Sequence, residues 1–253
     1  MRTIKIGDRS IDTLSLQCCL PGLTLDGSFG VSTERAVLEF QKNNGLVADG
    51  IVGPLSWGLL IPPRPEIKEE DWKRVASELG VEVAILKAIH EVEASSKSYL
   101  PQGYPALLFE AHVFYRELKA LRVDPGPLMK THPGIISRSW DRKLYKGGIG
   151  EIPRINEAYQ ISPVAALRSA SFGAFQISGF NCGPEGPFEF YRKIWTSEVG
   201  QLEVLSEFLR KAGIIPYMKS LNFKEIAKRY NGSGYAANNY DTKLRRAYLK
   251  YKS

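Results

Sequence analysis

The sequence predicts a mainly α-helical protein, made of a small three-helix domain and a larger helical domain. Apolar residues recur at spacings of three and four along most of the chain, as between residues 72 and 79, which is typical of helices with one buried face. Three prolines within residues 62–65 interrupt this pattern and stiffen the chain. We therefore expect domains at residues 1–62 and 71–253, joined by a linker at residues 63–70.

Chain length and charge distribution limit which classes of protein this sequence can belong to. A chain of 253 residues with 43% hydrophobic residues is long enough to bury a core in each part. Residues 1–62 carry 5 basic and 6 acidic side chains, whereas residues 63–253 carry 29 and 21, so the larger domain is the basic one. A basic surface suits nucleic acid, an anionic membrane or a bacterial envelope, and charge alone does not choose among them.

Cysteine and histidine usage argues against a disulfide framework and against a zinc hydrolase. The three cysteines are odd in number and two of them are adjacent, which favours reduced thiols. The three histidines form no HExxH motif, and the chain has no CxxC motif. We expect no metal and no cofactor.

Hydropathy predicts where the protein resides. The first ten residues contain no apolar segment of a secretory signal, and no stretch of 18 uncharged apolar residues occurs. We expect a protein that stays in the cytoplasm until something else releases it, with no stable insertion into a membrane.

The N-terminal part contains a weak internal duplication. The stretches Asp26–Thr33 and Asp49–Ser56 both begin with Asp-Gly and carry a second glycine three residues after the first. Glycines supply the positive φ angles of turns, and Thr33 and Ser56 are placed to cap the helix that follows each turn. The duplicated stretches and the apolar residues around them predict a core of three short helices.

A helix that ends in two glutamates is the candidate centre of the larger domain. One apolar stripe runs through Ala88, Ile89 and Val92. Glu93 falls on the flank of this stripe, whereas Glu91 lies about 200° away around the helix, so the two carboxylates cannot share one role. A carboxyl held against apolar side chains has a raised pKa and can act as a general acid at neutral pH. The alternative is that Glu93 is a boundary residue whose side chain reaches water.

Three other residues of the larger domain stand out. We expect a helix over residues 106–121, within which Glu110 is either a second cleft carboxylate or half of a buried ion pair. Trp140 lies in a glycine-rich loop and is either a sugar-stacking ring or an ordinary loop anchor. Gln176 is the lone amide of an apolar run, and is either a cleft residue or a core glutamine bonded to backbone. Further helices are expected over residues 152–170, 195–208, 223–230 and 240–251.

A set of turn and core residues spans most of residues 12–60. They are Leu16-Gln17, Asp26–Gly30, Thr33, Ala36-Val37, Phe40-Gln41, Gly45-Leu46, Asp49-Gly50, Gly53-Pro54 and Trp57. In this order they resemble the peptidoglycan-binding domain found at the ends of many cell-wall hydrolases. The resemblance implies that bacterial peptidoglycan is the partner of the small domain.

Three motifs of the larger domain follow one another in order. They are Glu93 at the end of its apolar helix, the run Ala170–Ile177, and the loop Tyr230–Gly234. Together they resemble the lysozyme-like superfamily, and more closely the N-acetylmuramidase domain of phage endolysins, over residues 70–250. That family has Glu-Val-Glu-Ser-Gly where this chain has Glu-Val-Glu-Ala-Ser, and the second glutamate of the motif corresponds to Glu93.

The resemblance implies a lysozyme-like fold and a reaction. Cleavage of the β-1,4 bond between N-acetylmuramic acid and N-acetylglucosamine requires a proton on the leaving oxygen, which Glu93 would give. If the enzyme is inverting, its base is expected to be Glu110, with Glu151 next and Asp141 after it. Substrate contacts are expected from Gln176, Tyr230, Asn231, Ser171 and Trp140.

The leading hypothesis is a phage-type endolysin that acts in host cell lysis. A lytic transglycosylase is a second possibility, and it needs no base because the muramic 6-hydroxyl attacks instead. A catalytically inactive wall-binding protein is the alternative from another class. We further expect a monomer that binds no nucleic acid and reaches the wall through a holin-type membrane lesion made by another protein.

Overall fold

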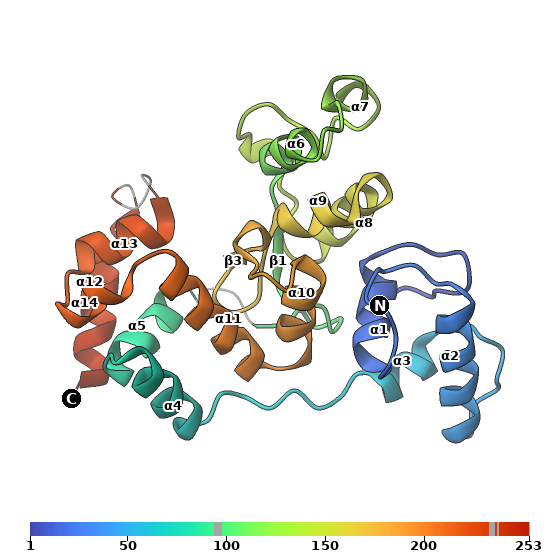
Figure 1. The fold of residues 1–253 in the computed structure, drawn as a ribbon, viewed down its shortest axis with the longest axis horizontal. Helices are drawn as coiled ribbons and strands as arrows, with labels where there is room; N and C mark the ends of the chain where they lie inside the picture. The colour runs from blue at the N-terminus through green and yellow to red at the C-terminus, as the bar shows by residue number, and fades with distance from the viewer. Residues whose placement is uncertain (94–97, 233–235, 237, 253) are drawn as a thin grey trace.

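The computed structural model describes residues 1–93, 98–232, 236 and 238–252. Two separate clusters of buried apolar side chains divide the chain. The smaller cluster draws its buried residues from residues 4–60, and the larger one is formed mainly by the rest of the chain. In Figure 1 the blue N-terminal helices lie at one end, and an extended segment connects them to the remaining helices.

Parts of two predicted motifs lie outside the described residues. These are Ala94–Ser96, which follow the glutamate helix, and Ser233–Tyr235 of the glycine loop.

The small domain contains α1 (Ile11–Cys19), α2 (Val31–Asn43) and α3 (Pro54–Leu60), so the three-helix prediction is confirmed. The sequence duplication is also structural. The Gln17 side chain accepts a hydrogen bond from the backbone of Gly27 (2.8 Å) and donates one to the aspartate before that glycine (2.8 Å). A buried glutamine therefore holds the first duplicated turn, and Gln41 makes the equivalent bonds in the second.

The second glutamine makes the same two bonds in the second turn. Gln41 accepts a hydrogen bond from the backbone of Gly50 (2.9 Å) and donates to the preceding aspartate (2.9 Å). Both glutamines are at most 3% exposed, so these bonds satisfy polar atoms that water does not reach.

Thr33 and Ser56 do not cap their helices, contrary to the prediction. α2 and α3 begin after Gly30 and Gly53, which make no side-chain cap bond. Thr33 and Ser56 are buried one turn further along, each with its hydroxyl 3.5 Å from the side-chain nitrogen of a buried glutamine. Their polar atoms complete the glutamine networks instead.

The larger domain is helical around a small sheet. Its helices are α4 (Glu69–Leu79), α5 (Val83–Glu93), α6 (Ala111–Ala120), α7 (Pro125–Thr131), α8 (Glu151–Ile161), α9 (Pro163–Arg168), α10 (Pro187–Thr196), α11 (Glu198–Lys211), α12 (Ile215–Lys219), α13 (Phe223–Asn231) and α14 (Tyr240–Lys252), with 3-10 turns η1 (Arg142–Leu144), η2 (Gly148–Gly150) and η3 (Gly179–Asn181). Strands β1 (Leu107–Phe109), β2 (Ala170–Phe172) and β3 (Ile177–Ser178) form an antiparallel sheet in that order. The mainly helical fold class is thus confirmed.

The sheet replaces part of a predicted helix. Residues 107–109 pair with β2, with Leu107 opposite Phe172, and α6 begins only after Glu110. A Leu-Leu-Phe run fits a buried strand as well as a helix, and pairing with a segment distant in sequence decides between them. Glu110 therefore precedes the first turn of α6 instead of lying within the helix.

Two other predicted helices are each broken in two. The helix expected over residues 152–170 stops at Ile161, because Pro163 lacks an N–H, and Ser162 caps α9 instead. Ser197 similarly ends α10 and caps α11. Helices α13 and α14 agree with the prediction to within one residue at each end.

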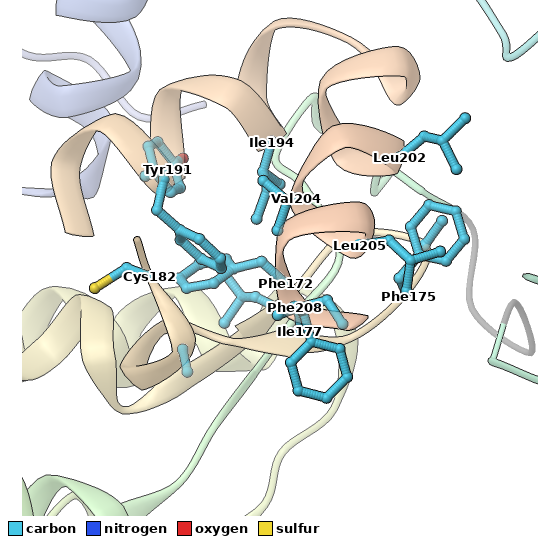
Figure 2. Close-up of a cluster of buried hydrophobic side chains, with 14 of the residues drawn as sticks. Phe172, Phe175, Ile177, Cys182, Tyr191, Ile194, Leu202, Val204, Leu205 and Phe208 are labelled. Atoms are coloured by element: carbon cyan, nitrogen blue, oxygen red, sulfur yellow. The ribbon is translucent and has the colours of Figure 1, made fainter. Parts of the chain in front are cut away.

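The hairpin formed by β2 and β3 is anchored in the main core. Its residues Phe172, Phe175 and Ile177 are at most 3% exposed. They lie among side chains of α10 and α11, including Tyr191 and Leu205 (Figure 2). This packing holds in place the turn between the two strands, which carries Gln176.

A buried polar network docks the small domain on the larger one. Asp12 of α1 is fully buried, and its carboxylate accepts hydrogen bonds from the Tyr104 hydroxyl and from the Asn156 amide (3.0 Å). Farther along the same helix, the hydroxyls of Ser15 and Tyr191 lie 2.8 Å apart. Because a buried carboxylate is costly unless its partners are in place, this network fixes how the two domains meet.

The segment between the domains is also attached to the larger domain. The Arg64 guanidinium lies 3.9 Å from the ring centroid of Tyr99 and 4.2 Å from that of Trp195. It also donates a hydrogen bond to the Gly103 carbonyl (2.6 Å). Cation–π stacking of this kind restrains the segment between the domains. The exact residues at which each domain begins and ends stay a prediction.

Candidate active site

Glu93 ends α5 in a small, mostly apolar pocket. α5 buries one face, from Ala84 to Ile89, and packs along α14 (teal and red in Figure 1). The pocket is narrow, with about 10 Å³ of space for a water-sized sphere. It is lined by Ile89, Val92, Glu93, Ile226, Ala227, Tyr230, Asn231, Tyr240 and Leu244. Glu93 is the one carboxylate among these lining residues.

The pocket changes the acidity of Glu93. Burial disfavours the charged form and raises the pKa of Glu93 from 4.5 to about 7, although a hydrogen bond from the Asn231 side chain opposes the shift. Burial also raises the pKa of Tyr230 and Tyr240, and the nearby charge of Glu93 adds to both shifts. Both phenols therefore stay protonated at neutral pH beside a carboxyl that is about half protonated.

Glu91 lies in different surroundings, as the helical periodicity predicts. Its carboxylate is bound by Lys250 (2.7 Å) and by the Tyr251 hydroxyl (2.7 Å) on the exposed side of α14. The hydrogen bond from Lys250 is the main reason that the pKa of Glu91 is lowered. Glu91 is thus an ionised surface residue with no proton to give at neutral pH.

Tyr230 links the Glu93 pocket to the β2–β3 hairpin. Its hydroxyl donates a hydrogen bond to the Phe175 carbonyl (2.9 Å). It also lines a second hollow, together with Gln176 and neighbouring residues of the hairpin and of α11 and α13. One tyrosine therefore forms part of the wall of both hollows.

Gln176 and Ser171 bond to each other within the hairpin. The Ser171 hydroxyl donates to the Gln176 side-chain oxygen (3.0 Å), and the Gln176 side-chain nitrogen donates to the Gly173 carbonyl (2.8 Å). Gln176 also has a positive φ of 47°, which is uncommon outside glycine. Gln176 thus bonds to backbone and also lines a hollow, while its contact with substrate stays a prediction.

Glu110 and Trp140 belong to a different cluster. The Tyr145 hydroxyl donates a hydrogen bond to Glu110, and His112 Nδ1 lies 3.4 Å from the same carboxylate. The rings of Trp140 and Tyr145 are 6.2 Å apart, and Trp140 is 61% exposed. Within the described part of the chain, neither Glu110 nor Trp140 lines the Glu93 pocket.

The other two candidate bases have structural roles. Glu151 is fully buried and accepts hydrogen bonds from the backbone of Lys146 (2.6 Å) and Gly147 (2.8 Å), and it forms an ion pair with Arg154. Asp141 bonds the backbone at the start of η1. Glu151 has no oxygen left to hold a catalytic water, so the structure argues against it as the base.

Tyr240 is a pocket residue that the sequence analysis did not select. It opens α14 and faces Glu93 because α14 packs on α5. The sequence offers one indication, a tyrosine six residues after Gly234 at the start of the last predicted helix, but the packing partner is not visible in the sequence. For the residues that the structure covers, no three histidine, cysteine or acidic side chains are grouped as metal ligands, and no helix is long and apolar enough to cross a membrane.

Comparisons with known proteins match both parts of the chain. A family model described as N-acetylmuramidase matches residues 82–252, and one described as a peptidoglycan binding domain matches residues 15–60. The crystal structure of the Burkholderia AP3 phage endolysin covers 99% of this chain and is itself 99% covered, with a TM-score of 0.67 and 36% sequence identity. A 39-residue stretch, 15% of this chain, is 54% identical to an uncharacterised protein from Kitasatospora aureofaciens, and it spans a third of that relative.

Proposed function

This chain belongs to the N-acetylmuramidase family of glycoside hydrolases, and we propose that it cleaves the β-1,4 bond between N-acetylmuramic acid and N-acetylglucosamine with Glu93 as general acid. The observation that carries the proposal is the carboxyl of Glu93, whose pKa the apolar pocket raises to about 7. Such a group still holds a proton at neutral pH for the leaving glycosidic oxygen. Asn231, Tyr230 and Tyr240 surround it with hydrogen-bonding groups that position the carboxyl and the sugar.

The second carboxylate in this proposal is Glu110. Its side chain is 23% exposed, so water reaches it, and the Tyr145 hydroxyl orients it. An inverting hydrolase needs a base that activates water at a carboxyl separation of roughly 6.5–9.5 Å. Trp140, exposed beside Tyr145, offers a ring on which a sugar of the same glycan strand stacks.

One observation favours a second candidate reaction. Among the described residues, the Glu93 pocket contains no other carboxylate. A lytic transglycosylase needs none, because the muramic 6-hydroxyl attacks and a 1,6-anhydro product forms. Product chemistry separates this reaction from hydrolysis.

In the proposed role the protein is a phage-type endolysin. Its N-terminal peptidoglycan-binding domain holds the wall while the docked catalytic domain cuts it. Support comes from the full-length similarity to a phage endolysin. We propose that a membrane lesion made by another protein gives it access to the wall, and lysis by this chain expressed alone in a bacterial cytoplasm would contradict that.

The deciding experiment is mass spectrometry of the soluble fragments that the protein releases from purified peptidoglycan. Wild type is compared with Glu93→Gln and with Glu78→Gln, which removes an exposed carboxylate on α4. Fragments with reducing N-acetylmuramic acid ends that disappear in Glu93→Gln alone would support hydrolysis by Glu93. Anhydro ends would make the protein a transglycosylase.

Other outcomes contradict the assignment of Glu93. Undiminished release by Glu93→Gln moves the acid to another carboxyl, and Glu110 is then tested in the same way. If neither wild type nor variant releases fragments but both bind the insoluble wall, the protein is an inactive wall-binding member of the family.

A further inference from the structure

A charged hollow lies directly beside the Glu93 pocket. It is formed by α5 and α14 and is lined by Glu91, Val92, Lys243, Arg246, Ala247 and Lys250. We call it the α14 hollow. Val92 lines both the α14 hollow and the Glu93 pocket, so the two share a wall. A ligand held in the α14 hollow therefore lies next to the proposed catalytic carboxyl.

The cations of the α14 hollow are spaced along one face of a helix. Lys243, Arg246 and Lys250 stand at positions i, i+3 and i+7 of α14, which places them on the same side one turn apart. With a rise of 1.5 Å per residue, they span about 10 Å along the helix axis. The hollow therefore suits an extended ligand that carries more than one negative charge.

The single acidic residue of the hollow does not neutralise these cations. Glu91 is bound by Lys250 (2.7 Å), and its lowered pKa keeps it ionised at neutral pH. Lys243 lies 5.5 Å from the ring centroid of Tyr240. In the part of the chain that the structure describes, no carboxylate lies within 4.0 Å of the Lys243 ammonium or of the Arg246 guanidinium. The charge of Glu91 acts on Arg246 as well as on Lys250, so three cations and one carboxylate leave the hollow a net charge of about +2 for a ligand.

We propose that the α14 hollow binds the carboxylates of the peptide that the muramyl residue carries, and so recognises peptide-bearing glycan next to the cleaved bond. This inference rests on the proposed function. The lactyl group of each muramic acid bears a peptide with free carboxylates, whereas the sugars of the glycan offer the cations no anionic partner. About three extended residues, at roughly 3.3 Å each, match the length of the row of cations.

Binding without turnover tests the proposal directly. The ligands are the disaccharide N-acetylglucosaminyl-N-acetylmuramic acid bearing a tetrapeptide on its lactyl group, and the same disaccharide with that lactyl carboxyl capped as an N-methylamide, so that the control carries no carboxylate. Neither contains the bond that a muramidase cuts. Dissociation constants are measured by NMR titration at low salt. We expect wild type to bind the peptide-bearing disaccharide about 5-fold more tightly than the peptide-free one, an effect of the size that two exposed charge pairs produce. Added salt reduces this preference.

Two double variants locate the effect. Lys243→Gln with Arg246→Gln removes two charges from the hollow and is expected to abolish the preference. Lys224→Gln with Arg245→Gln removes two exposed charges from α13 and from another face of α14, and is expected to keep it. All four side chains are exposed, so both variants are expected to unfold at the wild-type temperature.

Several results would overturn the inference. The first is that wild type binds both disaccharides equally. The second is that the preference for the peptide-bearing disaccharide survives in Lys243→Gln with Arg246→Gln. The third is that this preference falls by the same factor in the control variant. Displacement of the peptide ligand by an equal concentration of inorganic phosphate would show a general anion site and would also overturn it. Digestion of peptidoglycan by the same protein is measured independently of this binding preference. Preference without digestion refutes the proposed reaction alone, and digestion without preference refutes the inference alone.

Discussion

A Cβ atom added at Gly27 would lie 2.2 Å from the hydroxyl oxygen of Tyr159, a residue of the other domain. The same hydroxyl donates a hydrogen bond to the Asp26 carbonyl (2.9 Å). At Gly50, the equivalent glycine of the second turn, the nearest atoms belong to Glu34 of the small domain itself, at 3.4 Å. The first turn of the duplication is thus used for docking, whereas at the second the nearest described neighbours of the glycine belong to the small domain.

Gly27→Ala is expected to weaken this docking more than Gly50→Ala weakens its own turn. Both glycines have positive φ angles, +67° and +73°, so each substitution loses about 1 kcal/mol of stability through backbone strain. Gly27→Ala must also displace Tyr159, which adds about 1–3 kcal/mol. Chemical denaturation measures the difference, and faster proteolysis within residues 61–68 reports undocking. Equal losses in the two variants would contradict a docking role.

The hydrolytic rate is expected to fall as pH rises through about 7. Glu93 must be protonated to act as the acid, and its pKa in the folded protein is about 7, so its active form is lost above that pH. The measurement is the pH dependence of kcat/KM on soluble peptidoglycan fragments. A rate that stays constant from pH 6 to pH 9 would exclude Glu93 as the acid.

Asn231→Ala is expected to move this alkaline limb to higher pH. The hydrogen bond from Asn231 stabilises the ionised form of Glu93, so its removal raises the pKa of Glu93 further. The shift in the limb distinguishes this role from a simple loss of substrate binding, which would raise KM and leave the limb in place.

Glu93→Gln is expected to stabilise the protein at high pH. The folded-state pKa of Glu93 is raised from 4.5 to about 7, so the folded protein holds a proton that the unfolded chain has already lost between these values. Stability therefore falls as pH rises across that window. The glutamine variant avoids this loss, and we expect it to be more stable than wild type by about 1–3 kcal/mol at pH 8 and no more stable at pH 4. Urea denaturation at both pH values provides the comparison.

Glu110→Gln is expected to lose catalytic turnover, whereas Glu151→Gln is expected to lose folding stability. Glu151 pairs with a buried arginine, and removing its charge is expected to cost about 3–5 kcal/mol of stability. Glu110 is partly exposed, so its variant should keep the wild-type melting temperature and lose turnover. Thermal melts and kcat on one substrate test both. Normal turnover in a stable Glu110→Gln variant would favour the transglycosylase reaction.

Much of the fold was predictable from local pattern, and two of the exceptions share one cause. The periodicity around Glu93 separated it correctly from Glu91, because helix geometry fixes the faces of residues two apart. Leu107–Phe109 was predicted as helix and forms a strand, because its partner lies at residues 170–172. Thr33 was predicted as a cap and instead lies against Gln17. Both of these failures reflect a contact with a residue distant in sequence, whereas Pro163 and Ser197 divide their predicted helices locally.

Local sequence pattern was enough to predict the three-helix domain with its duplicated turns, the helical class of the larger domain and the apolar flank on which Glu93 lies. These depend on interactions within a few turns of chain, which spacing encodes. Tertiary structure alone decided that Tyr240 faces Glu93, that Glu151 is consumed by backbone bonds, and that Asp12 and Tyr159 fix one domain on the other. Those outcomes depend on which distant helices pack together, as α5 does with α14, and packing partners are not written in the spacing of residues.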